Sequence, residues 1–150
     1  MSYDLILSGG HVIDPANVRD GVMDVAVKGG RIAAVGAGLP GEATKTIDAA
    51  GMTVTPGLLD IHVHVYGGYA GWMFPDVHSF TSGVTTVVDT GGPGWKSFED
   101  FKTTIIDKSK TRVLSLLNIV GAGMLGAVEN DVAEMDAAAC AEMIRAHPEL

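Results

Sequence analysis

Two histidines spaced two residues apart, His62 and His64, are the residues of this sequence best suited to chemistry. They lie in the run Pro-Gly-Leu-Leu-Asp-Ile-His-Val-His-Val-Tyr, which occupies residues 56–66. Polar and apolar residues alternate there, which predicts a β-strand with Asp60, His62 and His64 on one face. Two imidazoles on the same face can reach one divalent metal ion without distorting the backbone. We therefore predict that His62 and His64 are metal ligands, since a merely solvated face more often carries Thr, Lys or Glu.

The elements that must position this pair follow it as alternating strands and helices. Residues 84–89 and 113–120 are apolar strands, as expected of parallel strands that are buried on both faces. Helices are predicted over residues 75–81, 97–108 and 131–145, the last one capped by Asp131. Repeated strand–helix units build a right-handed parallel sheet, and eight of them need about 250 residues. Residues 56–150 therefore predict an α/β unit with the first three strand–helix units of an incomplete (β/α)8 barrel.

Each of the last two predicted helices has an apolar stripe. The stripe of the first comprises Phe98, Phe101 and Ile105. The stripe of the second comprises Val132, Met135, Ala139 and Met143. Residues three or four positions apart share one face of a helix, so both stripes are expected to be buried.

Residues near the carboxyl ends of the three strands are candidates for substrate binding, because active sites form there in parallel strand–helix arrays. Tyr66 follows the histidine strand, Gly91 lies in a glycine-rich loop after the second strand, and Asn118 lies at the third. We predict that these three contact substrate. The glycines could equally form a plain tight loop, Asn118 could be a satisfied core amide, and Asp89 could simply cap the next turn. Residues 67–72 are expected to shape a pocket.

The first 55 residues read as a small all-β domain of the sandwich type. Short strands are expected at residues 3–7, 11–13, 22–28, 31–35, 44–48 and 52–55. The Gly9-Gly10 pair is expected to separate the first two. Gly29-Gly30 predicts a tight hairpin, because such turns require positive φ.

The sequence resembles the amidohydrolase superfamily of metal-dependent hydrolases. The resemblance rests on the run Thr-Pro-Gly-Leu-Leu-Asp-Ile-His-Val-His at residues 55–64, the opening at residues 6–15, the hairpin at residues 27–32, and Ser-Gly-Val-Thr-Thr-Val-Val-Asp at residues 82–89. It is greatest to the amidohydrolase/deacetylase branch, with dihydroorotases and hydantoinases as relatives. It implies the N-terminal part of a TIM-like (β/α)8 metallohydrolase barrel, preceded by the small β domain.

The same resemblance implies a cofactor and a reaction. It implies one or two divalent ions, zinc first, which activate water for attack on an amide or ester bond of an acylated small molecule. Members also use a carboxylated lysine, two further histidines and an aspartate on later strands, which this sequence does not contain. We therefore expect no catalytic residue in this chain, weak metal binding and negligible turnover by the chain alone.

Two other readings remain. A dihydroorotase or hydantoinase type of cyclic amidase is the first, although a dihydroorotase is expected to carry Arg where Tyr66 stands. A non-catalytic scaffold that keeps the start of an amidohydrolase fold is the second, and metal content distinguishes it from an enzyme.

Composition narrows the partners. The 150 residues carry a net charge of −8, with a sequence pI near 4.9, which disfavours nucleic acids and anionic membrane surfaces. Cys140 is the single cysteine, which fits a reducing cytoplasm. The sequence has no run of about 18 apolar residues, the length that predicts a membrane helix. We expect a cytoplasmic protein with a small-molecule substrate, and the acidic surface is compatible with a homo-oligomer.

Overall fold

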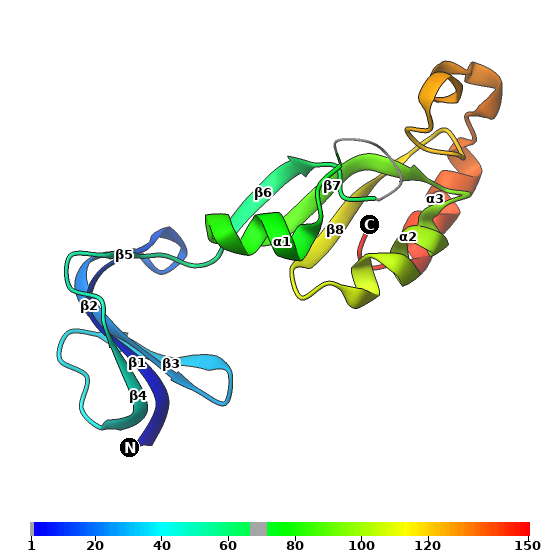
Figure 1. Cartoon of the computed structure of the whole chain (residues 1–150). Coiled ribbons are helices and arrows are strands. Elements are labelled where there is room, and N and C mark those ends of the chain that lie inside the picture. Colours follow the sequence, from blue (N-terminus) through cyan, green and yellow to red (C-terminus); the bar gives the residue numbers. More distant parts are fainter. Residues whose placement is uncertain (1, 67–71) are drawn as a thin grey trace. The chain divides into compact units, whose positions relative to one another are not determined.

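The computed structural model describes residues 2–66 and 72–150, which form two compact units. The first unit comprises residues 1–56 and the second residues 57–150. Each unit is considered by itself, and Figure 1 traces the elements of both. The glycine-rich part of the predicted pocket-shaping run, residues 67–71, lies outside the described residues.

The first unit is a five-stranded sheet. Its strands are β1 (Ser2–Asp14), β2 (Arg19–Lys28), β3 (Arg31–Gly36), β4 (Glu42–Asp48) and β5 (Thr53–Val54), with a 3-10 turn at Pro15–Asn17. The order is β3-β2-β1-β4, and β5 also pairs with β1. The antiparallel pairs are β1–β2 and β2–β3, whereas β4 and β5 run parallel to β1. Tyr3, Ile6 and Ala26 form its buried cluster.

The Gly9-Gly10 pair does not end the first strand, contrary to the prediction. β1 continues through it, and its register with β2 shifts between Leu7 and Gly10. Gly9 has a φ of +71°, which allows an extra residue to be accommodated as a bulge. A side chain at Gly10 would lie 2.6 Å from Val54 of β5, so a glycine is needed where these strands approach each other. The hairpin at Gly29 and Gly30 is confirmed, with φ values of +58° and +72°.

The second unit is built on a parallel sheet of three strands in the order β6-β7-β8. Its strands are β6 (Leu58–Val63), β7 (Val84–Gly94) and β8 (Arg112–Asn118). The helices are α1 (Pro75–Ser79), α2 (Phe98–Thr104) and α3 (Ala137–Ala146). Shorter 3-10 turns lie at Phe80–Ser82, Ile106–Lys108, Gly126–Asn130 and Val132–Glu134. Strand and helix therefore alternate three times, as predicted for an α/β unit (Figure 1).

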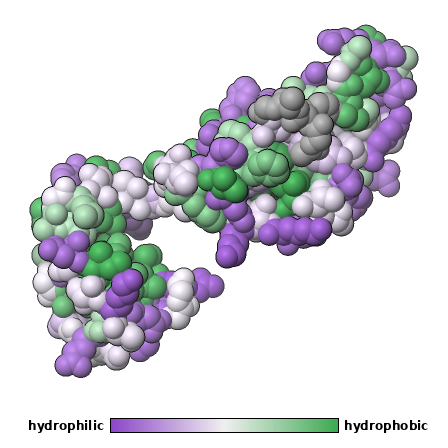
Figure 2. Space-filling model, in the orientation of Figure 1, coloured by the Kyte–Doolittle hydropathy of each residue, from purple (hydrophilic) through white to green (hydrophobic). Residues whose placement is uncertain are grey.

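The core of this unit lies between the sheet and its helices. Its buried residues are Val63, Val65, Val87, Phe98, Phe101 and Val113. Each strand supplies one of these valines, and Val65 follows the end of β6. Helix α2 supplies both phenylalanines, so it covers this face of the sheet. Met143 of α3 packs against the same cluster. Leu116, which alternation places on the opposite face of β8, is 59% exposed. Apolar side chains thus remain at the surface, as Figure 2 shows in green.

The helix predicted over residues 131–145 begins later than expected. Residues 132–134 form a 3-10 turn capped by Asp131, and α3 starts at Ala137. Met135 is extended and forms a β-bridge with Val120, which interrupts the helix. Asp136 then provides a new cap, because its carboxylate accepts hydrogen bonds from the amides of residues 138 and 139. Val132 and Met135, both predicted to be buried, are 74% and 41% exposed.

The helix predicted over residues 97–108 is also shorter than expected. It ends as an α-helix at Thr104 and continues as a 3-10 turn over Ile106–Lys108. Its predicted apolar stripe is confirmed, because Phe98 and Phe101 are fully buried and Ile105 packs against them.

Candidate metal centre

His62 and His64 are brought together by β6. His62 is the last residue but one of this strand, and His64 follows its end. The two ring centroids are 5.8 Å apart, and the rings are perpendicular. Two imidazoles that bind one zinc ion at about 2.0–2.1 Å have ring centres roughly 5–6 Å apart. The pair is therefore close enough to share one ion.

The strand that carries the pair is not regular. Asp60 pairs with Val87, and Val63 pairs with Asp89, so one residue too many lies on β6 between these two positions. Val63 and Val65 are buried, but Ile61 is 67% exposed. The predicted alternation therefore holds from residue 62 to residue 65 and fails at Ile61. Bulges of this kind redirect side chains and are frequent beside active sites.

The surroundings of His64 fit a bound cation. Its Nδ1 is buried, and no described residue forms a hydrogen bond with it. A buried polar atom without a partner costs free energy, which a metal ion or another ligand would recover. The His64 ring also lies against the indole of Trp72, with centroids 5.3 Å apart. In the described part of the chain, no group of three His, Cys, Asp or Glu residues could hold a metal. Metal binding by His62 and His64 therefore stays a prediction.

Asp89, which lies within β7 opposite the last residue of β6, is the residue that sequence reasoning undervalued. Its side chain is fully buried. One carboxylate oxygen accepts from the amides of Val65 at 2.7 Å and Tyr66 at 3.2 Å, and the other from the amide of Gly92 at 2.6 Å. The bond to Gly92 is the turn cap that the sequence suggested. For the other two bonds, the signal in the sequence was an acidic residue at the end of a largely apolar predicted strand, residues 84–89.

Gly91 and Asn118, both predicted to bind substrate, lie beside each other. The Asn118 side-chain amide donates to the Gly91 carbonyl at 3.3 Å, and its carbonyl accepts from the amide of Val120 at 3.0 Å. Gly91 has a φ of +85°. Asn118 thus links the last residues of β7 to the end of β8, as the satisfied-amide alternative proposed. Substrate contact by either residue stays a prediction.

The last residues of β7 and the loop after β8 also pack backbone against backbone. A side chain at Gly94 would collide with the Val120 carbonyl, and one at Gly123 would collide with the Gly92 carbonyl. The amide of Met124 donates to that same Gly92 carbonyl at 3.0 Å. These two segments are therefore closely packed against each other.

Tyr66 is held by α2. Its hydroxyl donates to Asp100 Oδ2 at 2.7 Å, and its ring packs against Phe101 with centroids 5.2 Å apart. The structure thus gives Tyr66 a packing role, and substrate contact by this residue stays a prediction.

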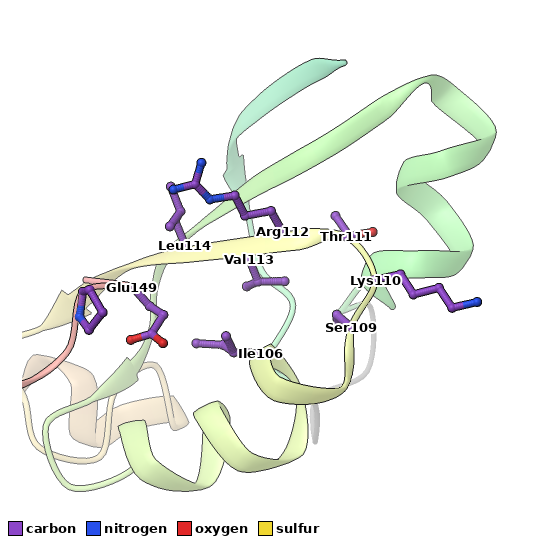
Figure 3. Close-up of a pocket in the computed structure, with 9 residues that line it drawn as sticks. Ile106, Ser109, Lys110, Thr111, Arg112, Val113, Leu114 and Glu149 are labelled. Atoms are coloured by element: carbon purple, nitrogen blue, oxygen red, sulfur yellow. The ribbon is translucent and has the colours of Figure 1, made fainter. Parts of the chain in front are cut away.

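A cavity of about 320 Å³ lies elsewhere in the second unit (Figure 3). Its lining includes Ser109, Lys110, Arg112, Val113 and Glu149. Figure 3 shows Arg112 and Leu114 on one side of β8 and Val113 on the other. The cavity is at the amino end of β8, whereas His62 and His64 are at the carboxyl end of a parallel strand. It therefore does not adjoin the histidine pair.

Comparisons with known proteins show what the chain as a whole resembles. No family model matches the chain. A deacetylase of Agrobacterium fabrum is 39% identical over 105 residues, covering 68% of this chain and 26% of that protein. An allantoinase of Escherichia coli is 51% identical over 65 residues, covering 43% of this chain and 14% of that protein. The chain thus spans about a quarter or less of the length of these curated relatives.

Solved structures extend the likeness over nearly the whole chain. An adenine deaminase has a TM-score of 0.77 and 29% identity, covering 99% of this chain and 39% of that one. A dihydroorotase has the same TM-score and 28% identity, covering 95% and 39%. A D-aminoacylase mutant solved with copper chloride is 39% identical at a TM-score of 0.51, covering 62% and 20%. The chain belongs to the amidohydrolase superfamily.

Within the described residues, no helix is both long and apolar enough to cross a membrane.

Proposed function

We propose that this chain supplies the metal-binding strand of a metal-dependent amidohydrolase, which cleaves an amide or ester bond of an acylated small molecule. The observation that carries the proposal is the histidine pair at the end of β6, with perpendicular rings 5.8 Å apart and a buried His64 nitrogen to which no described residue hydrogen-bonds. The likeness to a deacetylase and to a D-aminoacylase supports acylated substrates and a divalent metal.

In this proposal, His62 and His64 hold one edge of a divalent metal, with zinc as the first expectation. When bound, such an ion polarises a carbonyl and lowers the pKa of a water molecule toward neutrality. The chain's own residues orient the imidazoles, while Trp72 excludes water from one side of His64. Substrate would lie against the last residues of β7 and the end of β8, near Gly91 and Asn118.

Catalytic zinc sites normally use three protein ligands, and this pair provides two. We accordingly place the remaining ligands, and the catalytic acid and base, on segments that this sequence does not contain. This chain by itself would bind zinc weakly and show negligible turnover. A cytoplasmic location belongs to the same proposal.

A cyclic amide is the second candidate substrate. The allantoinase and the dihydroorotase among the similar proteins favour it. Tyr66 counts against dihydroorotate itself, because it stands where an arginine is expected and its hydroxyl is bonded to Asp100. Hydrolysis of N-acyl amino acids compared with cyclic amides separates the two candidates.

Metal binding to the purified chain tests the proposal. We would titrate zinc by calorimetry into the wild type, His62→Ala and His64→Ala, with His11→Ala as a matched control. His11 is exposed in the first unit and pairs with Asp20. We expect weak 1:1 binding that each site substitution abolishes and the control retains. Absence of binding in the wild type, or equal binding in all four proteins, would contradict the proposal and favour a non-catalytic scaffold.

A further inference from the structure

We propose that Asp89 is a positioning residue for the His62–His64 pair and acts through the peptide bond that follows His64. The proposal rests on the proposed function only in taking this pair as metal ligands. Asp89 is 0% exposed and follows buried strand residues of β7. A buried carboxylate is costly unless hydrogen bonds compensate it, so the partners of Asp89 indicate its role.

The peptide bond between His64 and Val65 is held on both sides. Its N–H, on Val65, donates to Asp89 Oδ2 at 2.7 Å, and its carbonyl, on His64, accepts from the amide of Met73 at 3.0 Å. A fixed peptide plane fixes the ψ angle of His64, and with it the direction in which the chain leaves this residue. The Tyr66 amide binds the same carboxylate oxygen at 3.2 Å, so the next peptide is oriented as well.

The second oxygen of Asp89 binds the backbone near Trp72. It accepts from the amide of Gly92 at 2.6 Å. A side chain at Gly92 would lie 2.7 Å from this oxygen and 2.8 Å from the Trp72 indole, so Gly92 is in close contact with both. Trp72 in turn contacts the His64 ring. The Asp89 carboxylate therefore fixes the backbone that follows His64. It also fixes Gly92, which contacts Trp72, the side chain that packs on the His64 ring.

Asp89→Asn tests this role with almost no change in volume. One acceptor oxygen becomes an NH2 donor, which must face a backbone N–H. We would measure Co²⁺ affinity by absorption, exchange of the Val65, Tyr66 and Gly92 amides by NMR, and the nuclear Overhauser effect between the rings of His64 and Trp72. Loss of a partner that orients a metal ligand typically lowers metal affinity 10–100-fold. We expect a loss of about that size, faster exchange of these amides and a weaker ring contact.

Thr90→Val is the matched control. Thr90 adjoins Asp89, and its hydroxyl donates to the Val63 carbonyl at 3.4 Å, so it links the same two strands without touching the His64 peptide. We expect Thr90→Val to keep wild-type Co²⁺ affinity, amide exchange and ring contact. An equal effect of the two substitutions would overturn the proposal, since it would reduce Asp89 to a general link between strands.

The metal-free NMR measurements separate this inference from the proposed function. Failure of the wild type to bind Co²⁺ would refute the proposed function alone, while amide exchange and the ring contact would still judge Asp89. A folded Asp89→Asn protein with wild-type amide exchange and ring contact would overturn the positioning role. If the wild type binds Co²⁺, an equal Co²⁺ affinity of Asp89→Asn would overturn it as well. If Asp89→Asn does not fold, Gly92→Ala replaces it. That variant should weaken the His64–Trp72 contact, and an unchanged contact would overturn the proposal.

Discussion

The hydroxyl of Tyr66 donates a 2.7 Å hydrogen bond to Asp100, and this bond ties the segment after the histidine strand to helix α2. We expect Tyr66→Phe to lower the free energy of unfolding of the second unit by about 0.5–1 kcal/mol, because the ring contact with Phe101 remains. A double-mutant cycle with Asp100→Ala should give a coupling energy of similar size. Both tryptophans of the chain lie in this unit, so their fluorescence during urea denaturation measures it. A coupling energy of zero would show that the bond does not contribute.

Phe101 should be the most sensitive core position that we can name. It is fully buried and touches both Phe98 and Tyr66. Phe101→Ala is expected to destabilise the second unit by about 3–5 kcal/mol, from lost burial and the cavity left behind. Phe74→Ala, at an exposed position of the same unit, should cost less than about 1 kcal/mol. Similar costs for the two would contradict the assigned core.

Val18 is a strained residue on the first unit. It has a φ of +53° and a ψ of +47°, and it is 94% exposed. The left-handed conformation costs an L-residue about 1–2 kcal/mol, of which a glycine is free. We therefore expect Val18→Gly to stabilise the unit by about 0.5–1 kcal/mol, measured by hydrogen exchange of residues 2–56. Val22→Gly is the matched control, because the same substitution within β2 should destabilise the first unit.

Asp24 makes the stability of the first unit depend on pH. The amide of Gly9, then that of Leu39, lower the pKa of its carboxyl below the usual 3.8. Because the folded state has the lower pKa, the contribution of Asp24 is fully present above about pH 3.8 and is lost as pH falls through the folded value. Asp24→Asn should cost about 1 kcal/mol at pH 7. Its stability should then fall less steeply than that of the wild type between pH 4 and pH 2.5, and parallel curves would contradict this.

The sequence allowed the strand–helix order and the histidine pair to be predicted, because both depend on local periodicity. It could not show where contacts between residues far apart in the sequence override the local pattern. Met135 leaves the predicted helix because it pairs with Val120, and β1 passes through Gly9 because β2 accommodates a bulge. Likewise, the three amides that converge on Asp89 come from two segments that only the folded sheet brings together.

The backbone contact between the last residues of β7 and the loop after β8 limits how this region can change. Gly94 and Gly123 leave no room for side chains, and the Gly92 carbonyl accepts a hydrogen bond from the Met124 amide, so an insertion in one segment would push the other away. The two segments would therefore have to be redesigned as a pair. A library intended to alter substrate preference should keep these glycines and vary Leu125, whose side chain is 49% exposed.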